Sequence, residues 1–446
     1  MTKKTEIKST VSLILPLMAA FLAQKAMQFI DTMMMGWLGP GALAAGAFGT
    51  AIFITVLVFC MGTISSVGVF ISRAKGANDQ EGIKTSLQNG VWMAILLSLP
   101  CVIIIWFAPH LIIGSENKEV IHNAVLLLHG LIIGLPGYLL FLVFREFISA
   151  FALTRIVMMV TTLSIPLTFS LNYIFIYGKW GLPSLGVSGI GYAGAIVMWT
   201  MFFGLFIYSL RNKTLKKYLT FKLFEIDLQK MRDMFFIGFP SGAYFILESA
   251  MFLSAIMMMG YFGVDALASF QITMQCVNIA YAIPFSLSMA TALQAGHAMG
   301  SGQFFRLKTI AMQNFSIGVL FSLSVAVLFI CFPGFFIKIF LNTDSSHMDT
   351  IRMATSFLII AAFFQCFDAI QAIANGMLRG SKDTFIPMVL SIGSYWIIGI
   401  ATAYYFSFHT FLGPKGIWYG ISFGIISLGT MLLIRLAKKL KSIEMK

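Results

Sequence analysis

The sequence predicts an all-α polytopic membrane protein. Of its 446 residues, 59% are hydrophobic and only 11% are charged, whereas a soluble domain carries about 25% charged residues. Apolar runs of about 20 residues recur from end to end, and a helix of that length crosses the hydrocarbon core of a bilayer. The runs are continuously apolar rather than alternating, so they favour helices over the strands of a closed barrel, the other structure that pairs its backbone inside a membrane.

About twelve such spans follow one another along the chain. The first run is longer than the apolar region of a signal peptide and no small-residue cleavage motif follows it, so we expect it to remain as a first span. We predict spans near residues 12–36, 47–72, 88–108, 122–144, 157–177, 188–210, 235–260, 270–298, 310–333, 353–378, 385–407 and 416–436.

The net charge of +13 comes from basic residues that lie between the apolar runs. They do not form a patch with interleaved aromatic residues on a soluble domain, so we expect no nucleic-acid partner. Most of them fall on the side of the N-terminus, including Arg73, Arg145 and the loop from Arg211 to Arg232. Because cytoplasmic segments are enriched in Lys and Arg, this asymmetry predicts that both termini are cytoplasmic.

The chain also repeats itself. Pro16 aligns with Pro240, the motif MMMG closes the matching span in each copy, and GVSGIGYA from Gly186 resembles GPKGIWYG from Gly413. Six spans return a chain to its starting side, so two copies in one orientation predict two six-helix lobes related by a pseudo-two-fold axis along the membrane normal. We place the N-lobe, with its six spans and half of the linker, at 1–222 and the C-lobe at 223–446.

Three acidic residues lie inside predicted spans: Asp31, Glu248 and Asp368. An ionised side chain near the bilayer centre costs about 2.5–3.5 kcal/mol, so none of them is expected to face lipid. A carboxylate in such a place favours a bound proton, Na⁺ or organic cation over a bare charge. The other interpretation is a carboxyl paired permanently with a neighbouring helix.

Polar neighbours accompany the carboxylate of the first span. Gln24, Gln28 and Asp31 recur at intervals of four and three residues, which places them on one face of a helix. Lys25 lies near the middle of the same span but on another face. We expect either a carboxylate partner for it on another span or a span that begins elsewhere.

The two later carboxylates have polar or aromatic neighbours one turn away. Phe364 and Gln371 share the helical face of Asp368, and Tyr244 precedes Glu248 by four residues. These residues are our candidates for a second site.

Several kinds of chemistry find no support in the sequence. The five cysteines lie in apolar runs without CxxC spacing, which predicts small buried residues rather than disulfides or metal thiolates. The sequence contains no HExxH, GxSxG or P-loop motif. We therefore expect a protein that is not an enzyme, has no cofactor, and draws its energy from a gradient of Na⁺ or H⁺.

Nearly the whole chain resembles the multidrug and toxic compound extrusion (MATE) family, and within it the NorM-like branch. The resemblance lies in FIDTMMMGWLGPGALAA from Phe29, SRAKGAND from Ser72 and LNYIFIYGKWGLPSLGVSGIG from Leu171. In the second half it lies around Glu248 and in FQCFDAIQAIANGMLRGSKDT from Phe364. This resemblance implies a MATE/MOP-type fold and a functional monomer in the bacterial inner membrane that exports small organic cations in exchange for Na⁺ or H⁺.

The resemblance also assigns roles to particular positions. Asp31 matches the aspartate of the first span that is implicated in ion coupling and drug binding, and Asn172 matches an asparagine of the same cluster. Glu248 and Asp368 match carboxylates proposed to bind Na⁺. Two positions depart from the NorM-like pattern, because Phe364 stands where a tyrosine is usual and Thr168 where a second asparagine is frequent. Lys25 has no counterpart in the pattern.

Two other functions compete with a multidrug antiporter. A flippase for a lipid-linked, polyanionic substrate would share the architecture, but we would expect more basic residues in its cavity, where only Lys25 qualifies. An intramembrane enzyme would need a nucleophile with its base, or a metal cluster, inside the spans. The multidrug antiporter explains the repeat and the three carboxylates together.

Overall fold

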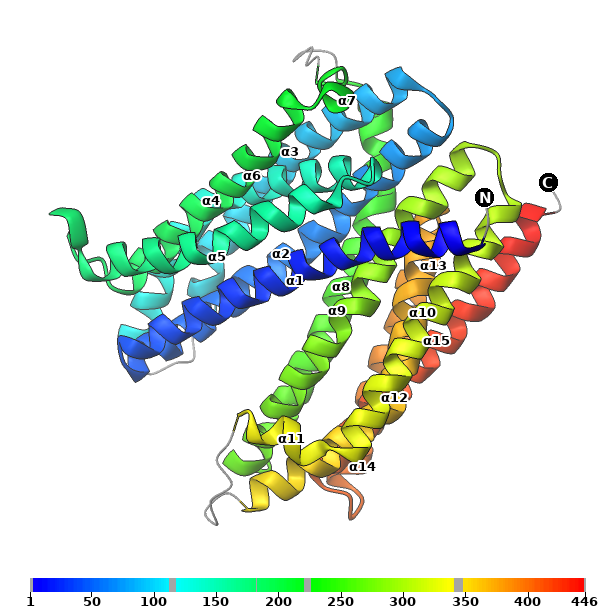
Figure 1. The fold of residues 1–446 in the computed structure, drawn as a ribbon. Helices are drawn as coiled ribbons and strands as arrows, with labels where there is room; N and C mark the ends of the chain where they lie inside the picture. The colour runs from blue at the N-terminus through cyan, green and yellow to red at the C-terminus, as the bar shows by residue number, and fades with distance from the viewer. Residues whose placement is uncertain (1–2, 112–117, 182, 220–225, 341–347, 445–446) are drawn as a thin grey trace. The chain divides into compact units, whose positions relative to one another are not determined.

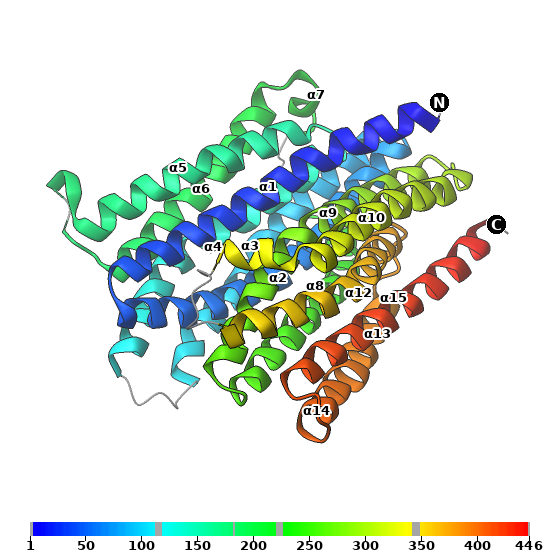
Figure 2. The ribbon, with the colours of Figure 1, turned by 60° about the horizontal axis from the view of Figure 1, so that its bottom comes forward.

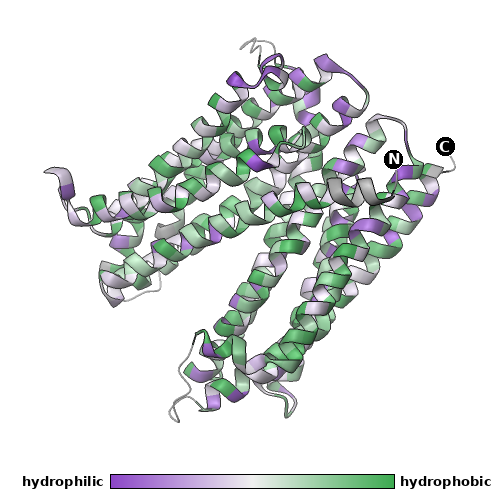
Figure 3. Ribbon diagram, in the orientation of Figure 1, coloured by the Kyte–Doolittle hydropathy of each residue, from purple (hydrophilic) through white to green (hydrophobic). Residues whose placement is uncertain are grey.

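The computed structural model describes residues 3–111, 118–181, 183–219, 226–340 and 348–444. In these ranges all regular structure is helical, and twelve helices are long and apolar enough to cross a membrane. The predicted all-α class and the twelve spans are thus confirmed. Most helices extend beyond the predicted apolar runs, since polar residues add turns at both ends. Hydrophobic residues cover the helices, whereas many hydrophilic ones gather at helix ends and connections (Figure 3).

The chain divides into two compact units, of which one comprises Val11–Gly242. Within it α4 packs closely along α6 and along α2, which both views of the ribbon show (Figures 1 and 2). The helices that contribute to this unit are α1 (Lys3–Trp37), α2 (Pro40–Gly76), α3 (Gln80–Leu111), α4 (Lys118–Ala150), α5 (Thr154–Tyr177), α6 (Val187–Arg211), the short η1 (Lys179–Gly181) and α7 (Lys213–Lys216), and the beginning of α8 (Leu228–Gly260).

The other unit comprises Met1–Thr10 and Ala243–Lys446. Here α12 is the central helix, because it packs against α9, α10 and α15. The eleventh span consists of α13, a π-helical segment and α14 in direct succession. Besides the end of α8, the helices are α9 (Val264–Gly300), α10 (Phe305–Cys331), α11 (Pro333–Lys338), α12 (Met348–Gly380), α13 (Phe385–Ser391), η3 (Ile392–Ile400), α14 (Ala401–Phe408) and α15 (Pro414–Glu444).

The repeat seen in the sequence recurs in the backbone of the turns. Gly39 before α2 has a φ of 110°, and Gly263 before α9 has a φ of 95°. Gly186 before α6 and Gly413 before α15 likewise have φ values of 55° and 53°. Glycine adopts positive φ without steric cost, so the repeated glycines start matching helices in each half in the same way. The predicted boundary at residues 222 and 223 lies outside the described residues.

Helix α8 contributes to both units, and its first part crosses α2 at glycines. A Cβ on Gly62 of α2 would lie 2.6 Å from the Gly242 Cα atom, and one on Gly238 would lie 2.2 Å from the Thr63 carbonyl oxygen. Only glycine allows two helix backbones to approach this closely, and such small residues commonly mediate helix packing in membranes. The crossing fixes the beginning of α8 against the unit that holds α1–α6.

Candidate functional site

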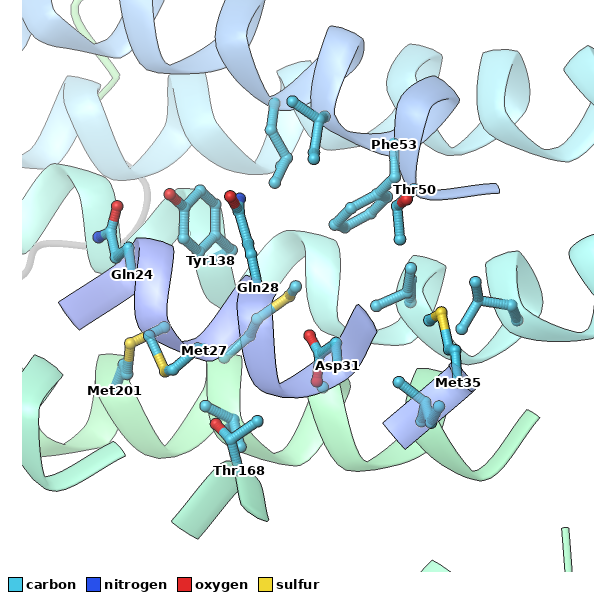
Figure 4. A pocket seen from close by; sticks show the side chains of 18 residues that line it. Gln24, Met27, Gln28, Asp31, Met35, Thr50, Phe53, Tyr138, Thr168 and Met201 are labelled. Carbon is cyan, nitrogen blue, oxygen red and sulfur yellow. The ribbon is translucent and has the colours of Figure 1, made fainter. Parts of the chain in front are cut away.

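The unit Val11–Gly242 contains a cavity of about 120 Å³. Its lining includes Gln24, Gln28 and Asp31, which share one face of α1 as predicted (Figure 4). Thr168 of α5 lines it as well. The rest of the lining is mostly apolar and comes from α2, α4 and α6. Within the described chain the lining includes no Lys or Arg. The Asp31 carboxylate is thus the one acidic group in an otherwise neutral pocket.

Asn172 of α5 holds the Asp31 carboxylate in place. Its Nδ2 donates a hydrogen bond of 2.7 Å to Asp31 Oδ1. The Asn172 side chain is fully buried, and its Oδ1 has no hydrogen-bond partner among the described residues. An unpaired buried carbonyl oxygen is costly, so this oxygen is available to a cation or to water beside Asp31. The family resemblance assigned both residues to one cluster, and the structure brings them into contact.

Four methionines line the same cavity, together with Tyr138 of α4. Thioether side chains are flexible and polarisable, which suits a surface that must fit ligands of different shapes. Figure 4 shows Met27 and Met201 side by side, with Met35 at the other end of the cavity. The sequence analysis named neither these positions nor Tyr138, since periodicity does not show which apolar face encloses a cavity. The four are Met27, Met35, Met198 and Met201.

Lys25 matches neither of the two expectations: in the described residues its printed partner is not a carboxylate, and the first span, Thr10–Trp37, still has Lys25 near its middle. Its side chain is exposed, its Nζ donates to Gln28 Oε1 at 3.4 Å, and its ammonium lies 5.6 Å from the centre of the Phe21 ring. All three residues lie on α1, one turn apart. In the described part of the chain, the ammonium of Lys25 therefore lies near an amide and an aromatic ring of its own helix.

The unit Ala243–Lys446 brings its two predicted carboxylates together through one side chain. Gln371 Nε2 donates to Glu248 Oε1 at 3.2 Å and to Asp368 Oδ1 at 3.0 Å. The hydroxyl of Tyr395 donates to Gln371 Oε1 at 3.2 Å. Tyr395 belongs to η3 and was missed by the sequence analysis. Its signal was weak, since one tyrosine in an apolar span is ordinary, whereas π-helical segments that often accompany functional sites are not visible in a sequence.

Tyr244 and Phe364 occupy different positions around this cluster. Tyr244 is buried with its ring centre 6.3 Å from that of Tyr395, and its hydroxyl makes no hydrogen bond of ordinary geometry with the described residues. Phe364 is fully buried and stacks on Trp418 of α15, with ring centres 6.3 Å apart and planes at 12°. Tyr244 can therefore turn its oxygen to a ligand, whereas Phe364 contributes packing.

One buried ion pair escaped the sequence analysis, which counted three acidic residues inside spans and assigned Arg145 to a cytoplasmic segment. Helix α4 continues past Arg145, and both Arg145 and Glu146 are buried, with the Arg145 Nη2 atom 2.9 Å from Glu146 Oε1. Glu146 is thus a buried helical carboxylate beyond the three that were predicted. The apolar run stops at Arg145, so hydropathy alone placed the pair outside the span.

The cysteines are free thiols. Cys60 and Cys101 are buried with their Sγ atoms 3.4 Å apart, and Cys276 is buried as expected. Cys366 is half-buried, and Cys331 is exposed at the end of α10, so the prediction of small buried residues is wrong for Cys331. An exposed thiol on a membrane helix needs no polar partner, because cysteine behaves as a small apolar side chain.

The sequence profile of the MatE family matches residues 16–174 and 240–405. The chain belongs to the MatE family. The two matched segments reproduce the internal repeat, and together they contain all the candidate residues of both clusters.

Named relatives and solved structures agree with this membership. The chain is 34% identical to the probable multidrug resistance protein NorM of Pseudomonas aeruginosa, over 94% of this chain and 87% of that protein. It is 33% identical to the protein of the same name from Pseudomonas putida, over 94% and 92%. The crystal structure of a eukaryotic MATE transporter superposes with a TM-score of 0.88 at 20% identity, covering 99% and 98% of the two chains. The resemblance to the MATE family and its NorM-like branch is confirmed.

Proposed function

We propose that this MATE protein is a secondary active antiporter that exports organic cations in exchange for Na⁺ or H⁺. The observation that carries the proposal is the cavity of the first unit, where the Asp31 carboxylate and two glutamines face a neutral, apolar lining without Lys or Arg. Such a pocket attracts a positive charge with an apolar body. The NorM relatives, named as multidrug resistance proteins, support the same substrate class.

Exchange follows from competition for Asp31. In a site of low dielectric one carboxylate strongly prefers to be neutralised, and it can bind a cargo cation, Na⁺ or a proton, but not all of them together. Asn172 Nδ2 occupies one carboxylate oxygen and leaves the other to the competing cation. Binding of the coupling ion to Asp31 therefore lowers the affinity for the cargo, and binding of the cargo displaces the ion.

The methionine side chains can move to let the cavity widen when cargo enters. Sites for drug-sized ligands measure about 300–1,000 Å³, so the cavity of about 120 Å³ must widen before a large cation enters. Thioether side chains can change rotamer at small cost. We therefore expect cargo molecules of different shapes to be accommodated by Met27, Met198 and Met201.

We further propose that the cluster of the second unit binds the coupling cation. Glu248, Asp368 and the Tyr395 hydroxyl provide oxygen atoms, which are the ligands preferred by hard cations such as Na⁺. Gln371 Nε2 donates to both carboxylates. A cation that binds both must displace this amide group, so its arrival would change the contact between α8 and α12.

The energy for transport would come from an ion gradient, not from a cofactor or a catalysed reaction. One elementary charge crossing 100 mV supplies about 2.3 kcal/mol, which corresponds to about a fiftyfold accumulation. We propose that the protein works as a monomer in the bacterial inner membrane with both termini in the cytoplasm. A polyanionic lipid-linked cargo is disfavoured, because the described cavity lining offers its charge no Lys or Arg.

The test uses purified protein in sealed vesicles that contain a fluorescent organic cation such as ethidium. Na⁺ and pH gradients are imposed separately, and efflux is followed with wild-type protein and with empty vesicles. We expect efflux that depends on at least one of the two gradients. Efflux that is equal in protein-containing and empty vesicles under both gradients would refute the antiport.

A further inference from the structure

We infer that the buried hydroxyl face of α5 carries the coupling cation between Asp31 and the cytoplasmic end of the first unit. This face is formed by Thr161, Ser164 and Thr168, which recur at intervals of three and four residues on the N-terminal side of Asn172. All three are buried, at 0%, 3% and 2% exposure. Thr168 lines the cavity that contains Asp31. The inference rests on the antiport proposed above and adds a route for its ion.

The orientation of the hydroxyl groups favours a cation over an anion. Thr161 Oγ1 donates to the Val157 carbonyl oxygen at 2.9 Å, Ser164 Oγ to that of Val160 at 2.9 Å, and Thr168 Oγ1 to that of Ser164 at 2.8 Å. Because each hydroxyl hydrogen is directed to the backbone of α5, the oxygen lone pairs remain free. These groups can therefore coordinate Na⁺ or accept hydrogen bonds from water that carries a proton.

Unpartnered buried atoms lie beside Asp31 and also on α4, at a depth similar to that of Thr161. Toward the C-terminus of α5, Asn172 Oδ1, next to Asp31, has no partner among the described residues. On α4, Arg145 Nε and Ser149 Oγ likewise have no partner among the described residues, and Arg145 Nη2 pairs with Glu146. Buried polar atoms are nearly always paired with protein or water. Their presence at both depths indicates that water or an ion completes these sites.

The dimensions of the helices support a connected route. At 1.5 Å per residue, Thr161 lies about 16 Å along α5 from Asn172, roughly half the hydrocarbon thickness of about 30 Å. Helix α4 ends at Ala150 and α5 begins at Thr154. Thr161 and Arg145 are thus each about 8–10 Å from the same tight turn, at a similar depth. Glu146 neutralises Arg145, so the pair presents no net positive barrier.

Helix α5 also provides a matched control. Thr162 and Ser170 are exposed on the same helix, so replacing them removes the same atoms away from the proposed route. The test compares the double variant T161V/S164A with the control T162V/S170A and with T161S/S164T, which keeps both hydroxyl groups. Each protein is examined for equilibrium binding of ethidium and for gradient-driven efflux from vesicles.

We expect T161V/S164A to bind ethidium within about twofold of wild type but to export it at least tenfold more slowly, while the other two variants resemble wild type. Wild-type efflux by T161V/S164A would overturn the route, as would a joint loss of binding and transport, which would indicate a structural role. If wild-type protein shows no gradient-driven efflux at all, the antiport itself fails, and that outcome is distinguished by the wild-type arm alone.

Discussion

Asp31 carries a charge that is unfavourable inside a membrane, and Asn172 holds its carboxylate in place. Because Asn172 supplies a single hydrogen bond to one oxygen, the carboxylate is oriented without being neutralised, which is the condition for binding an exchangeable cation. A permanent ion pair would have removed that capacity. The sequence left both interpretations open, and in the described residues the partner is a neutral amide.

The substitution Asp31→Asn should abolish efflux without affecting the fold. Asparagine keeps the size and an oxygen that accepts from Asn172, but it removes the charge for which cargo and ion compete. We expect efflux to fall at least a hundredfold, measured in vesicles at equal protein content, with an unchanged melting temperature in detergent. Asp349→Asn, at an exposed carboxylate in the first turn of α12, is the control and should transport normally. Normal efflux by Asp31→Asn would exclude the role.

The carboxylates of the second unit should control the response to the ion more than the binding of cargo. In the double variant Glu248→Gln/Asp368→Asn both charges disappear, while the contacts to Gln371 keep acceptor oxygens. We expect ethidium binding to persist and any Na⁺ stimulation that wild-type efflux shows to be lost, measured by varying Na⁺ at constant ionic strength. An unchanged Na⁺ response would place the ion site elsewhere.

Among the structural elements, the crossing of α2 and the beginning of α8 depends on glycines, which have no side chain to hold the two backbones apart. A valine at Gly62 would place its Cβ 2.6 Å from the Gly242 Cα atom, where backbone cannot yield as a flexible side chain does. Overpacking of this kind costs about 1–3 kcal/mol. We expect Gly62→Val to lower the melting temperature in detergent. Gly36→Ala, at a site with nothing within 4 Å, is the control and should not destabilise the protein.

The buried ion pair of α4 offers a second test at this scale. Removing one partner of a buried pair leaves an uncompensated charge, which costs about 3–5 kcal/mol. We therefore expect Glu146→Gln to destabilise the protein strongly, measured by thermal unfolding in detergent. Glu81→Gln breaks a pair with Lys84 in which the Glu81 side chain is 74% exposed, and such surface pairs contribute only about 0–1 kcal/mol. Equal effects of the two substitutions would show that the Arg145–Glu146 pair is hydrated and weak.

Across the whole molecule, the sequence predicted the features that follow from hydropathy and from the spacing of motifs. The twelve spans, the repeat and the cluster of Asp31 with Asn172 follow from apolar length, from aligned motifs and from family resemblance. Tyr395, the cavity methionines and the buried Glu146 could not be predicted in this way. Tyr395 and the methionines depend on which face of a helix meets another helix, and continuously apolar spans carry almost no periodic signal for their inward face. Glu146 lies where α4 continues beyond the apolar run, which hydropathy does not show.

The distribution of charge along the whole chain predicts the orientation in the membrane. Basic residues are concentrated in segments on the side of the N-terminus, and an even number of spans brings the C-terminus to that side. A fluorescent protein that folds only in the cytoplasm should therefore emit when fused after Lys446. A phosphatase that is active only outside the cytoplasm should be inactive there but active when inserted at Phe411, in the exposed turn before α15. The reverse pair of signals would invert the topology, and with it the direction in which Asp31 would release its cargo.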